Sequence, residues 1–262
     1  MDGTLPGGVA NAGQVIRQGN SVLRPSNPHS VSIHAFLTAL RANTGFNGAS
    51  LPIEIQDDGR ERLVFVEGDV PIPPYPLWAQ SSDALASIAL LLFEFHTASA
   101  LVAPHLLTWS DELADPSGGS IVCHNDVCME NVVFRDGVAV GLLDFDFAAP
   151  GRPLYDLAQF ARMCVPIDDD MSAALLGWQI TDHPDRLRVV TEVYELDKDA
   201  RGEFLECLDR TMNRGQDFVR RRVEAGDPNF IRMLKDMGGI ERYERRRRWW
   251  ESRRGDFVEA LG

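Results

Sequence analysis

The chain has 262 residues, 44% hydrophobic and 25% charged, which is enough to bury a sizeable core and suits one large domain or two lobes that share a cleft. Its formal net charge of −13 argues against a nucleic-acid partner, and fits either simple solubility or a cationic ligand. The longest apolar run, residues 88–93, is too short to cross a bilayer, and the four cysteines show neither a CxxC pair nor zinc spacing. We therefore expect a cytoplasmic protein with reduced thiols and no membrane contact.

The first part of the chain is predicted to form a small antiparallel sheet that carries one helix. Residues 13–25 form two short alternating runs around Gly19, and residues 50–68 read as a second hairpin around DDGRE. Between them, residues 30–45 have apolar side chains at helical spacing and end at Gly45. Residues 67–78 are rich in proline and predict an extended connector.

Beyond the connector the pattern becomes helical. Residues 81–102 open with capping Ser and Asp side chains and carry a broad apolar face, which indicates a helix buried deep in a larger lobe. From Pro153 onward helices dominate. We expect an N-lobe at 1–68, a connector at 69–78 and a C-lobe at 79–262.

Residues 241–257 combine arginines and tryptophans. Because glutamates are interleaved at helical spacing, the pattern favours a solvated helix with Trp249 or Trp250 packed inward over a nucleic-acid patch.

The stretch 122–146, VCHNDVCMENVVFRDGVAVGLLDFD, places carboxylates beside apolar runs. Asp126 and Asn131 follow a short strand, and Asp144 ends another strand that folds back across the turn at 135–137. A hairpin would return Asp144 to the edge that carries Asp126 and Asn131. Two carboxylates and an amide oxygen suit Mg²⁺, which commonly bridges to substrate phosphates.

Transfer of a phosphoryl group to an alcohol needs a metal and a carboxylate that positions the hydroxyl. Asp126 is the candidate for the carboxylate, with Asn131 and Asp144 as metal ligands. His124 precedes Asp126 by two residues and is expected to brace the loop rather than to transfer protons.

Residues 124–158, with the spacing H-x-D-x4-N followed by Asp144 and Asp156, resemble the catalytic core of the aminoglycoside phosphotransferase and choline kinase superfamily. The resemblance implies an α+β, protein-kinase-like two-lobe fold, with a small antiparallel sheet and one helix in the N-lobe and a larger, mainly helical C-lobe. It also implies ATP and Mg²⁺ as cofactors, Asp126 as the catalytic residue, and Asp156 as a tie between the next helix and the catalytic loop. Asp146 is either a further metal ligand or structural support beside the metal, and structural support is favoured.

The match departs from the family at the phosphate-binding lysine, because this chain has no lysine before Lys198. Arg24 stands on the equivalent strand and either binds phosphates through its guanidinium or caps a strand edge at the surface; Arg17 is the substitute candidate. The helix at 30–45 has no acidic residue, so the usual Lys–Glu ion pair is expected to be absent.

The other nucleotide contacts are expected by analogy. Gly7 and Gly8 would cover the phosphates, and the backbone around Glu67, Gly68 and Val70 would face the adenine.

The resemblance predicts a small-molecule kinase whose acceptor is a polar or cationic alcohol, with an aminoglycoside or another cationic antibiotic as the first candidate. The acidic residues Asp168 to Asp170 would either suit such a cation or cap a helix. The alternative is a non-catalytic binding or immunity protein, a pseudokinase, on the same fold. A monomer is favoured.

Overall fold

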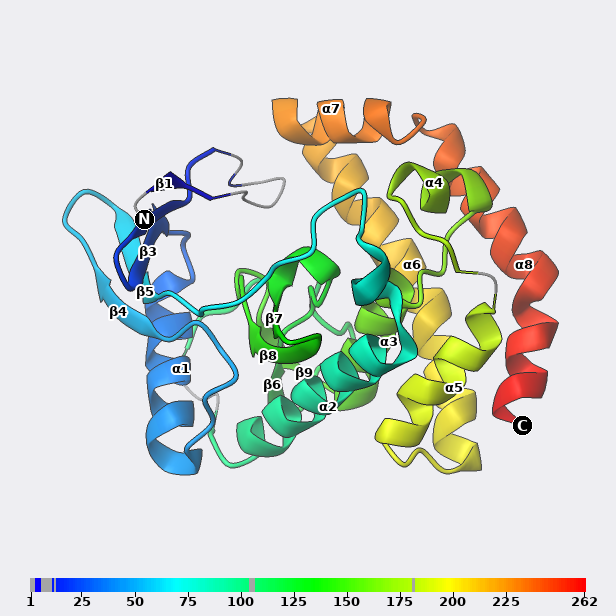
Figure 1. Cartoon of the computed structure of the whole chain (residues 1–262), viewed down its shortest axis with the longest axis horizontal. Coiled ribbons are helices and arrows are strands. Elements are labelled where there is room, and N and C mark those ends of the chain that lie inside the picture. Colours follow the sequence, from blue (N-terminus) through cyan, green and yellow to red (C-terminus); the bar gives the residue numbers. More distant parts are fainter. Residues whose placement is uncertain (1–2, 6–10, 12, 104–106, 181) are drawn as a thin grey trace.

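The computed structural model describes residues 3–5, 11, 13–103, 107–180 and 182–262. A five-stranded antiparallel sheet with the order β1-β2-β3-β5-β4 and a single helix, α1, form the N-terminal part (Figure 1). The strands are β1 (Gly3–Thr4), β2 (Ile16–Gln18), β3 (Ser21–Pro25), β4 (Pro52–Ile55) and β5 (Arg60–Val64). Both predicted hairpins are present.

Helix α1 (Ser30–Thr44) packs through one face, with Ile33, Phe36, Leu37 and Leu40 buried. It ends where predicted because Gly45 adopts φ 77, a left-handed conformation that glycine enters without steric cost, and donates its N–H to the Arg41 carbonyl.

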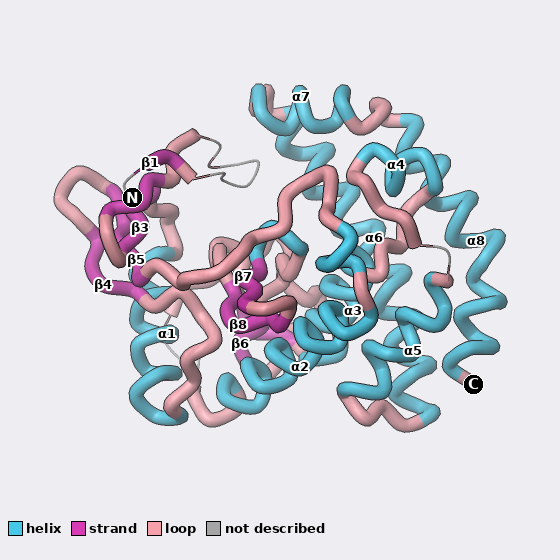
Figure 2. The backbone as a smooth tube through the Cα atoms, in the orientation of Figure 1, coloured by secondary structure: helices cyan, strands magenta, loops and turns pink. Residues whose placement is uncertain are grey.

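The proline-rich connector runs as a loop from the sheet to a short 3₁₀ helix, η1 (Leu77–Gln80) (Figure 2). Asp69 of this connector exchanges two backbone hydrogen bonds of 2.8 Å with Phe134 of the C-terminal part. A second tie joins the Ser50 N–H to the Leu142 carbonyl at 3.1 Å. The two lobes are thus linked by backbone bonds as well as by the covalent chain, although the exact lobe boundaries stay a prediction.

Two small sheets lie at the centre of the molecule (Figure 1). Strands β7 (Val132–Arg135) and β8 (Val138–Leu142) form the predicted hairpin. The strand before His124, β6 (Ile121–Cys123), does not join this hairpin and pairs instead with β9 (Ala149–Gly151). A 3₁₀ turn, η2 (Met129–Asn131), separates β6 from β7 and lets each strand take a different partner.

Helices make up the rest of the chain, with α8 outermost in the view of Figure 1. The main core contains fully buried side chains from both lobes, such as Phe36, Phe134 and Phe204. Trp250 packs inward with 3% of its surface exposed, as predicted for the C-terminal helix. Among the described helices none is long and apolar enough to cross a membrane. The helices are α2 (Ser82–Ser99), α3 (Pro153–Cys164), α4 (Asp170–Leu175), α5 (His183–Val193), α6 (Lys198–Glu224), α7 (Pro228–Asp236) and α8 (Glu241–Leu261).

Candidate active site

The β7–β8 hairpin brings the predicted site residues to one place. The Leu143 N–H donates to the Asn131 carbonyl at 2.8 Å, so Asp144 follows directly beside Asn131. The Asn131 amide donates to the Asp126 carbonyl at 2.9 Å and to its carboxylate at 3.2 Å. Asp126, Asn131 and Asp144 therefore share one edge, as the spacing in the sequence predicts.

Arg24 reaches this edge from strand β3 of the other lobe. Its guanidinium donates to Glu61 at 2.6 Å, to Asp144 at 2.7 Å and to Asp146 at 2.6 Å. Only 7% of Arg24 is exposed, which rules out a cap at a surface strand edge. A single side chain thus joins the N-lobe sheet to the two aspartates that follow β8.

Helix α1 carries no acidic residue, as the sequence shows, but Arg24 has a carboxylate partner elsewhere in the N-lobe. The partner comes from strand β5, where Glu61 lies opposite Arg24 in the register of the sheet. Helix α1 supplies His34, which contacts the second oxygen of Glu61 at 2.8 Å. The usual Lys–Glu pair is therefore absent, as expected, and an Arg–Glu pair between neighbouring strands stands in its place.

Burial and charge give the three aspartates different proton affinities. Although burial opposes it, the charge and hydrogen bond of Arg24 hold the pKa of Asp144 below its ordinary value. Burial and the charge of Asp144 raise the pKa of Asp146 to about 7. Burial also raises the pKa of Asp126 well above its ordinary value, helped by Asp144 and opposed by Arg162. Asp126 is therefore a stronger base than an exposed carboxylate.

The donor set at this edge fits Mg²⁺. Asn131 uses its NH₂ group as a donor, so its amide oxygen is turned away from Asp126 and accepts no hydrogen bond from the part of the chain that is described. One oxygen of Asp144 binds Arg24, and the side chain remains 25% exposed. Carboxylate and amide oxygens are the ligands that this hard cation prefers, although Arg24 competes for Asp144.

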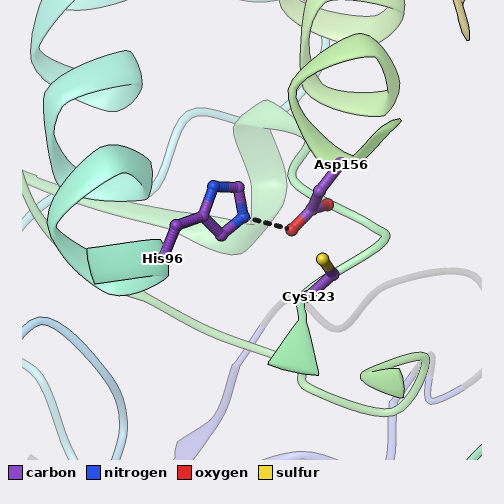
Figure 3. Close-up of side chains that lie close together, drawn as sticks. All are labelled: His96, Cys123 and Asp156. Carbon is purple, nitrogen blue, oxygen red and sulfur yellow. Dashed lines mark hydrogen bonds and ion pairs between the residues drawn. The ribbon is translucent and has the colours of Figure 1, made fainter. Parts of the chain in front are cut away.

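A buried network holds the catalytic loop in place (Figure 3). Asp156 of α3 accepts hydrogen bonds from the backbone N–H groups of His124 at 2.7 Å and Asn125 at 2.8 Å. His96 of α2 contacts the same carboxylate at 2.9 Å, and Figure 3 shows its ring pointing at Asp156. These bonds fix Asn125 at a positive φ of 64, an uncommon conformation for a residue other than glycine.

His96, Cys123 and Asp156 lie close enough to resemble a metal site, since their ligand atoms are within 4.8 Å of one another. However, both oxygens of Asp156 already accept hydrogen bonds, and the second nitrogen of His96 contacts the Tyr194 hydroxyl at 3.2 Å. Burial also raises the pKa of the Cys123 thiol well above its ordinary value, which disfavours the thiolate that binds metals. The cluster is a structural brace.

His124 has both ring nitrogens engaged within the loop. One nitrogen contacts the Leu143 carbonyl at 2.8 Å, and the other accepts from the Asp126 N–H at 3.3 Å. Burial lowers the pKa of His124, so the ring is neutral at pH 7. This geometry suits the predicted role of His124, which is to brace the catalytic-loop segment rather than to transfer protons, and that role stays a prediction.

The residues proposed for the nucleotide are less closely grouped. Glu67 pairs with Arg17 at 3.2 Å, and the Arg17 guanidinium lies 3.7 Å from the centre of the Phe65 ring. Gly68 packs against Phe134, where a Cβ would lie 2.3 Å from the carbonyl oxygen. Val70 is 36% exposed. Gly7 and Gly8 lie outside the described residues, so the covering loop stays a prediction.

The acidic residues at 168–170 are all occupied. Asp169 caps helix α4 by accepting from the Ser172 N–H, and Arg245 pairs with it at 3.1 Å. Arg242 pairs with Asp168, and the Trp249 indole donates to Asp170 at 3.0 Å. Helix α8 thus pairs two of the three carboxylates that a cationic acceptor was expected to use, and the capping alternative holds for Asp169.

A cavity of about 520 Å³ lies between α6 and α8. Its lining includes Arg246 and Trp250 but none of the residues of the catalytic loop. The edge that carries Asp126, Asn131 and Asp144 is therefore not part of the lining of this cavity.

Comparison with known proteins decides the family. The model of the phosphotransferase enzyme family matches residues 30–190, a span from helix α1 to helix α5 that includes the whole catalytic edge. The chain belongs to this family. This chain is also 31% identical, over 200 residues, to the trifolitoxin immunity protein of Rhizobium leguminosarum bv. trifolii. That match covers 74% of this chain and 75% of the immunity protein.

Solved structures agree with the two-lobe, kinase-like fold. A choline/ethanolamine kinase family protein from Mesorhizobium loti aligns with a TM-score of 0.65 at 15% identity, covering 100% of this chain and 91% of that one. The aminoglycoside phosphotransferase APH(4)-Ia, as a thermostable mutant, aligns with a TM-score of 0.58 at 13% identity, covering 96% and 94%. At these identities the likeness shows the fold, and the predicted fold class is confirmed.

Proposed function

We propose that this family member is an ATP- and Mg²⁺-dependent phosphotransferase that acts on a hydroxyl of a small molecule. The observation that carries the proposal is the convergence of Asp126, Asn131 and Asp144 at one edge, closed from the N-lobe by Arg24. Mg²⁺, when bound at Asn131 and Asp144, would neutralise phosphate oxygens. The γ-phosphoryl group would leave ADP and bond to the acceptor oxygen, while Asp126 orients the hydroxyl and takes its proton.

An aminoglycoside or another cationic antibiotic is the first candidate acceptor, which would give the protein a role in antibiotic resistance. Structures whose names include gentamicin and streptomycin complexes support a small polar acceptor by fold analogy alone. The pairing of Asp168 and Asp169 with arginines removes the local reason for a cation. The proposal is therefore restricted to a small-molecule alcohol.

The second candidate is a non-catalytic binding or immunity protein. Two observations favour it: the similarity to the trifolitoxin immunity protein, and the three carboxylates that already bind Arg24. An Arg24 held in this way would have to exchange partners before it could meet a phosphate.

Calorimetric titration with ATP, with and without Mg²⁺, separates the two candidates. A phosphotransferase is expected to bind ATP more tightly with Mg²⁺, and Asp144→Asn should abolish that gain. Asp136→Asn, an exposed change in the β7–β8 turn, is the matched control and should behave like wild type. Folded protein that binds no nucleotide under either condition would favour the binding protein.

A further inference from the structure

Four arginines lie around Asp168 and Asp169, and one of them, Arg162, is also close enough to Asp126 for the two charges to interact. Arg162 comes from α3, and Arg242, Arg245 and Arg246 come from α8. The nearby carboxylates that pair with them are Asp168, which binds Arg242, and Asp169, which binds Arg245. Two of the four guanidinium groups are therefore left without an acidic partner.

Arg162 is the more unusual of the two. Within the described residues it forms no ion pair, and its buried Nε atom has no hydrogen-bond partner. Burial and the charge of Arg246 lower the pKa of Arg162 to about 10, against the opposing charges of Asp126 and Asp168. Its guanidinium lies over Gly215 of α6, where an added Cβ would come within 3.3 Å of the guanidinium carbon. Glycine is unfavourable inside a long helix, and here Gly215 leaves room for the arginine.

Arg246 is 7% exposed and donates only at long range, to the Met212 carbonyl at 3.4 Å. It too pairs with no carboxylate of the described chain. Both guanidinium groups lie against α6, Arg162 at Gly215 and Arg246 at the Met212 carbonyl, about one helical turn apart. Arg162 is half-buried and Arg246 is buried, and because an unpaired charge that is partly removed from water is costly, the two together favour an anionic partner from outside the chain.

We propose that Arg162 and Arg246 form a subsite for an anionic group, a carboxylate or a phosphate, carried by the alcohol that Asp126 engages. The planar guanidinium binds such groups through paired hydrogen bonds. The subsite deepens the proposed function, on which it rests, because it sets the charge of the acceptor. A hydroxy acid or a phosphorylated alcohol would fit it, and choline or an aminoglycoside would be repelled.

The test compares acceptors that differ mainly in charge: choline, glycerol, glycerate and glycerol 3-phosphate. Release of ADP is measured with Mg·ATP for wild type, Arg162→Gln and Arg246→Gln. The control is Arg248→Gln. Arg248 is exposed on α8, the helix that carries Arg246, and its ion pair with Glu244 is long, at 3.7 Å. Glycerate and glycerol 3-phosphate distinguish a carboxylate site from a phosphate site.

Wild type is expected to favour the anionic alcohols, and Arg162→Gln should lower the ratio of kcat/KM for anionic over neutral acceptors by about 10- to 100-fold, mainly through KM. The ratio is used because Arg162 also acts on the charge of Asp126. That effect changes kcat/KM for every acceptor alike, so it cancels when anionic and neutral acceptors are compared. Arg162→Lys should recover part of the ratio, and Arg248→Gln should leave it unchanged. An unchanged ratio in both Arg162→Gln and Arg246→Gln would overturn the subsite.

A binding experiment separates the subsite from the reaction. Glycerate and glycerol 3-phosphate are titrated into the ADP complex by calorimetry, with thermal unfolding as the check on each variant's fold. Binding that Arg162→Gln removes, without any phosphotransfer, would keep the subsite and reject the proposed function. Turnover of neutral or cationic alcohols, without binding of either anion, would keep the proposed function and reject the subsite.

Discussion

Individual charged residues in this protein are expected to differ sharply in how much they stabilise the fold, and the contrast is clearest within the N-lobe sheet. Glu61 is 1% exposed and has a partner at each oxygen, Arg24 and His34. Glu54, on the adjacent strand, is half exposed and pairs with Arg62 at 3.1 Å. Buried pairs cost several kcal/mol when one partner is removed, whereas exposed pairs contribute little.

Glu61→Gln is therefore expected to lower the free energy of unfolding by about 3–5 kcal/mol, because it leaves Arg24 with one carboxylate fewer and His34 with a weaker partner. Glu54→Gln, the matched exposed change, should cost less than about 1 kcal/mol. Urea denaturation of both variants checks this. Equal effects from the two changes would contradict the expectation that burial makes the loss of Glu61 more costly than the loss of Glu54.

Asp156 is a second buried carboxylate on which the stability of the protein is expected to depend. Asp156→Asn replaces an acceptor that serves three donors by a group that must turn its own NH₂ toward at least one of them. We expect a loss of about 3–5 kcal/mol at pH 7, measured by urea denaturation, and a small loss for the exposed Asp136→Asn. Although burial acts in the other direction, the His96 hydrogen bond and charge lower the pKa of Asp156. Its contribution is therefore complete above about pH 4 and is lost as the pH falls further, so the two proteins should converge in acid.

At the scale of elements, the contact between α5 and α8 contains a titratable group. His183, at the start of α5, packs edge-on against the Trp249 ring with centroids 5.1 Å apart. Burial lowers its pKa to about 4, and the nearby Arg253 and Arg186 act in the same direction against Asp170 and Asp182. The folded protein thus resists a proton that the unfolded chain accepts.

Because the unfolded pKa is near 6.5, stability is expected to fall as the pH drops from 6.5 to about 4, and the His183 contribution to this fall is about 1–3 kcal/mol. His183→Gln should flatten that part of the pH profile. An NMR titration of the histidine rings gives the pKa of His183 directly. A value at or above 6.5 would contradict the prediction.

The elements also show how far the sequence reaches. Gly45 and the hairpin turns are local signals, so helix α1 and the N-lobe strands were predicted close to their observed bounds. The pairing of β6 with β9 and of Arg24 with Glu61 is non-local, and 37 residues separate the latter pair. The alternation in β5, which buries Glu61 and Leu63, was the one available signal for Glu61. Arg162 gave no sequence signal, because its meaning depends on which carboxylates α8 has already paired.

At the scale of the whole molecule, the placement of one lobe against the other depends on close backbone contacts at the connector. Gly68 has φ 146 and touches Phe134, and the next residue, Asp69, is the one that forms the paired backbone bonds to Phe134. Gly59 also has a positive φ, at 80, but an added Cβ there meets nothing within 4 Å. A side chain at Gly59 would therefore meet backbone strain alone, whereas one at Gly68 would also collide with the other lobe.

Gly59→Ala is expected to cost about 1–2 kcal/mol, the usual strain of a positive φ. Gly68→Ala should cost more, because a Cβ placed 2.3 Å from the Phe134 carbonyl oxygen forces the connector away from β7 and breaks the Asp69 bonds. Thermal unfolding measures the stability of both variants, and limited proteolysis reports opening at the connector. Since the proposed adenine contacts lie beside Gly68, Gly68→Ala should also weaken ATP binding, whereas Gly59→Ala should not. Similar losses of stability and affinity in the two variants would mean that the lobes are positioned by their side-chain core rather than by this contact.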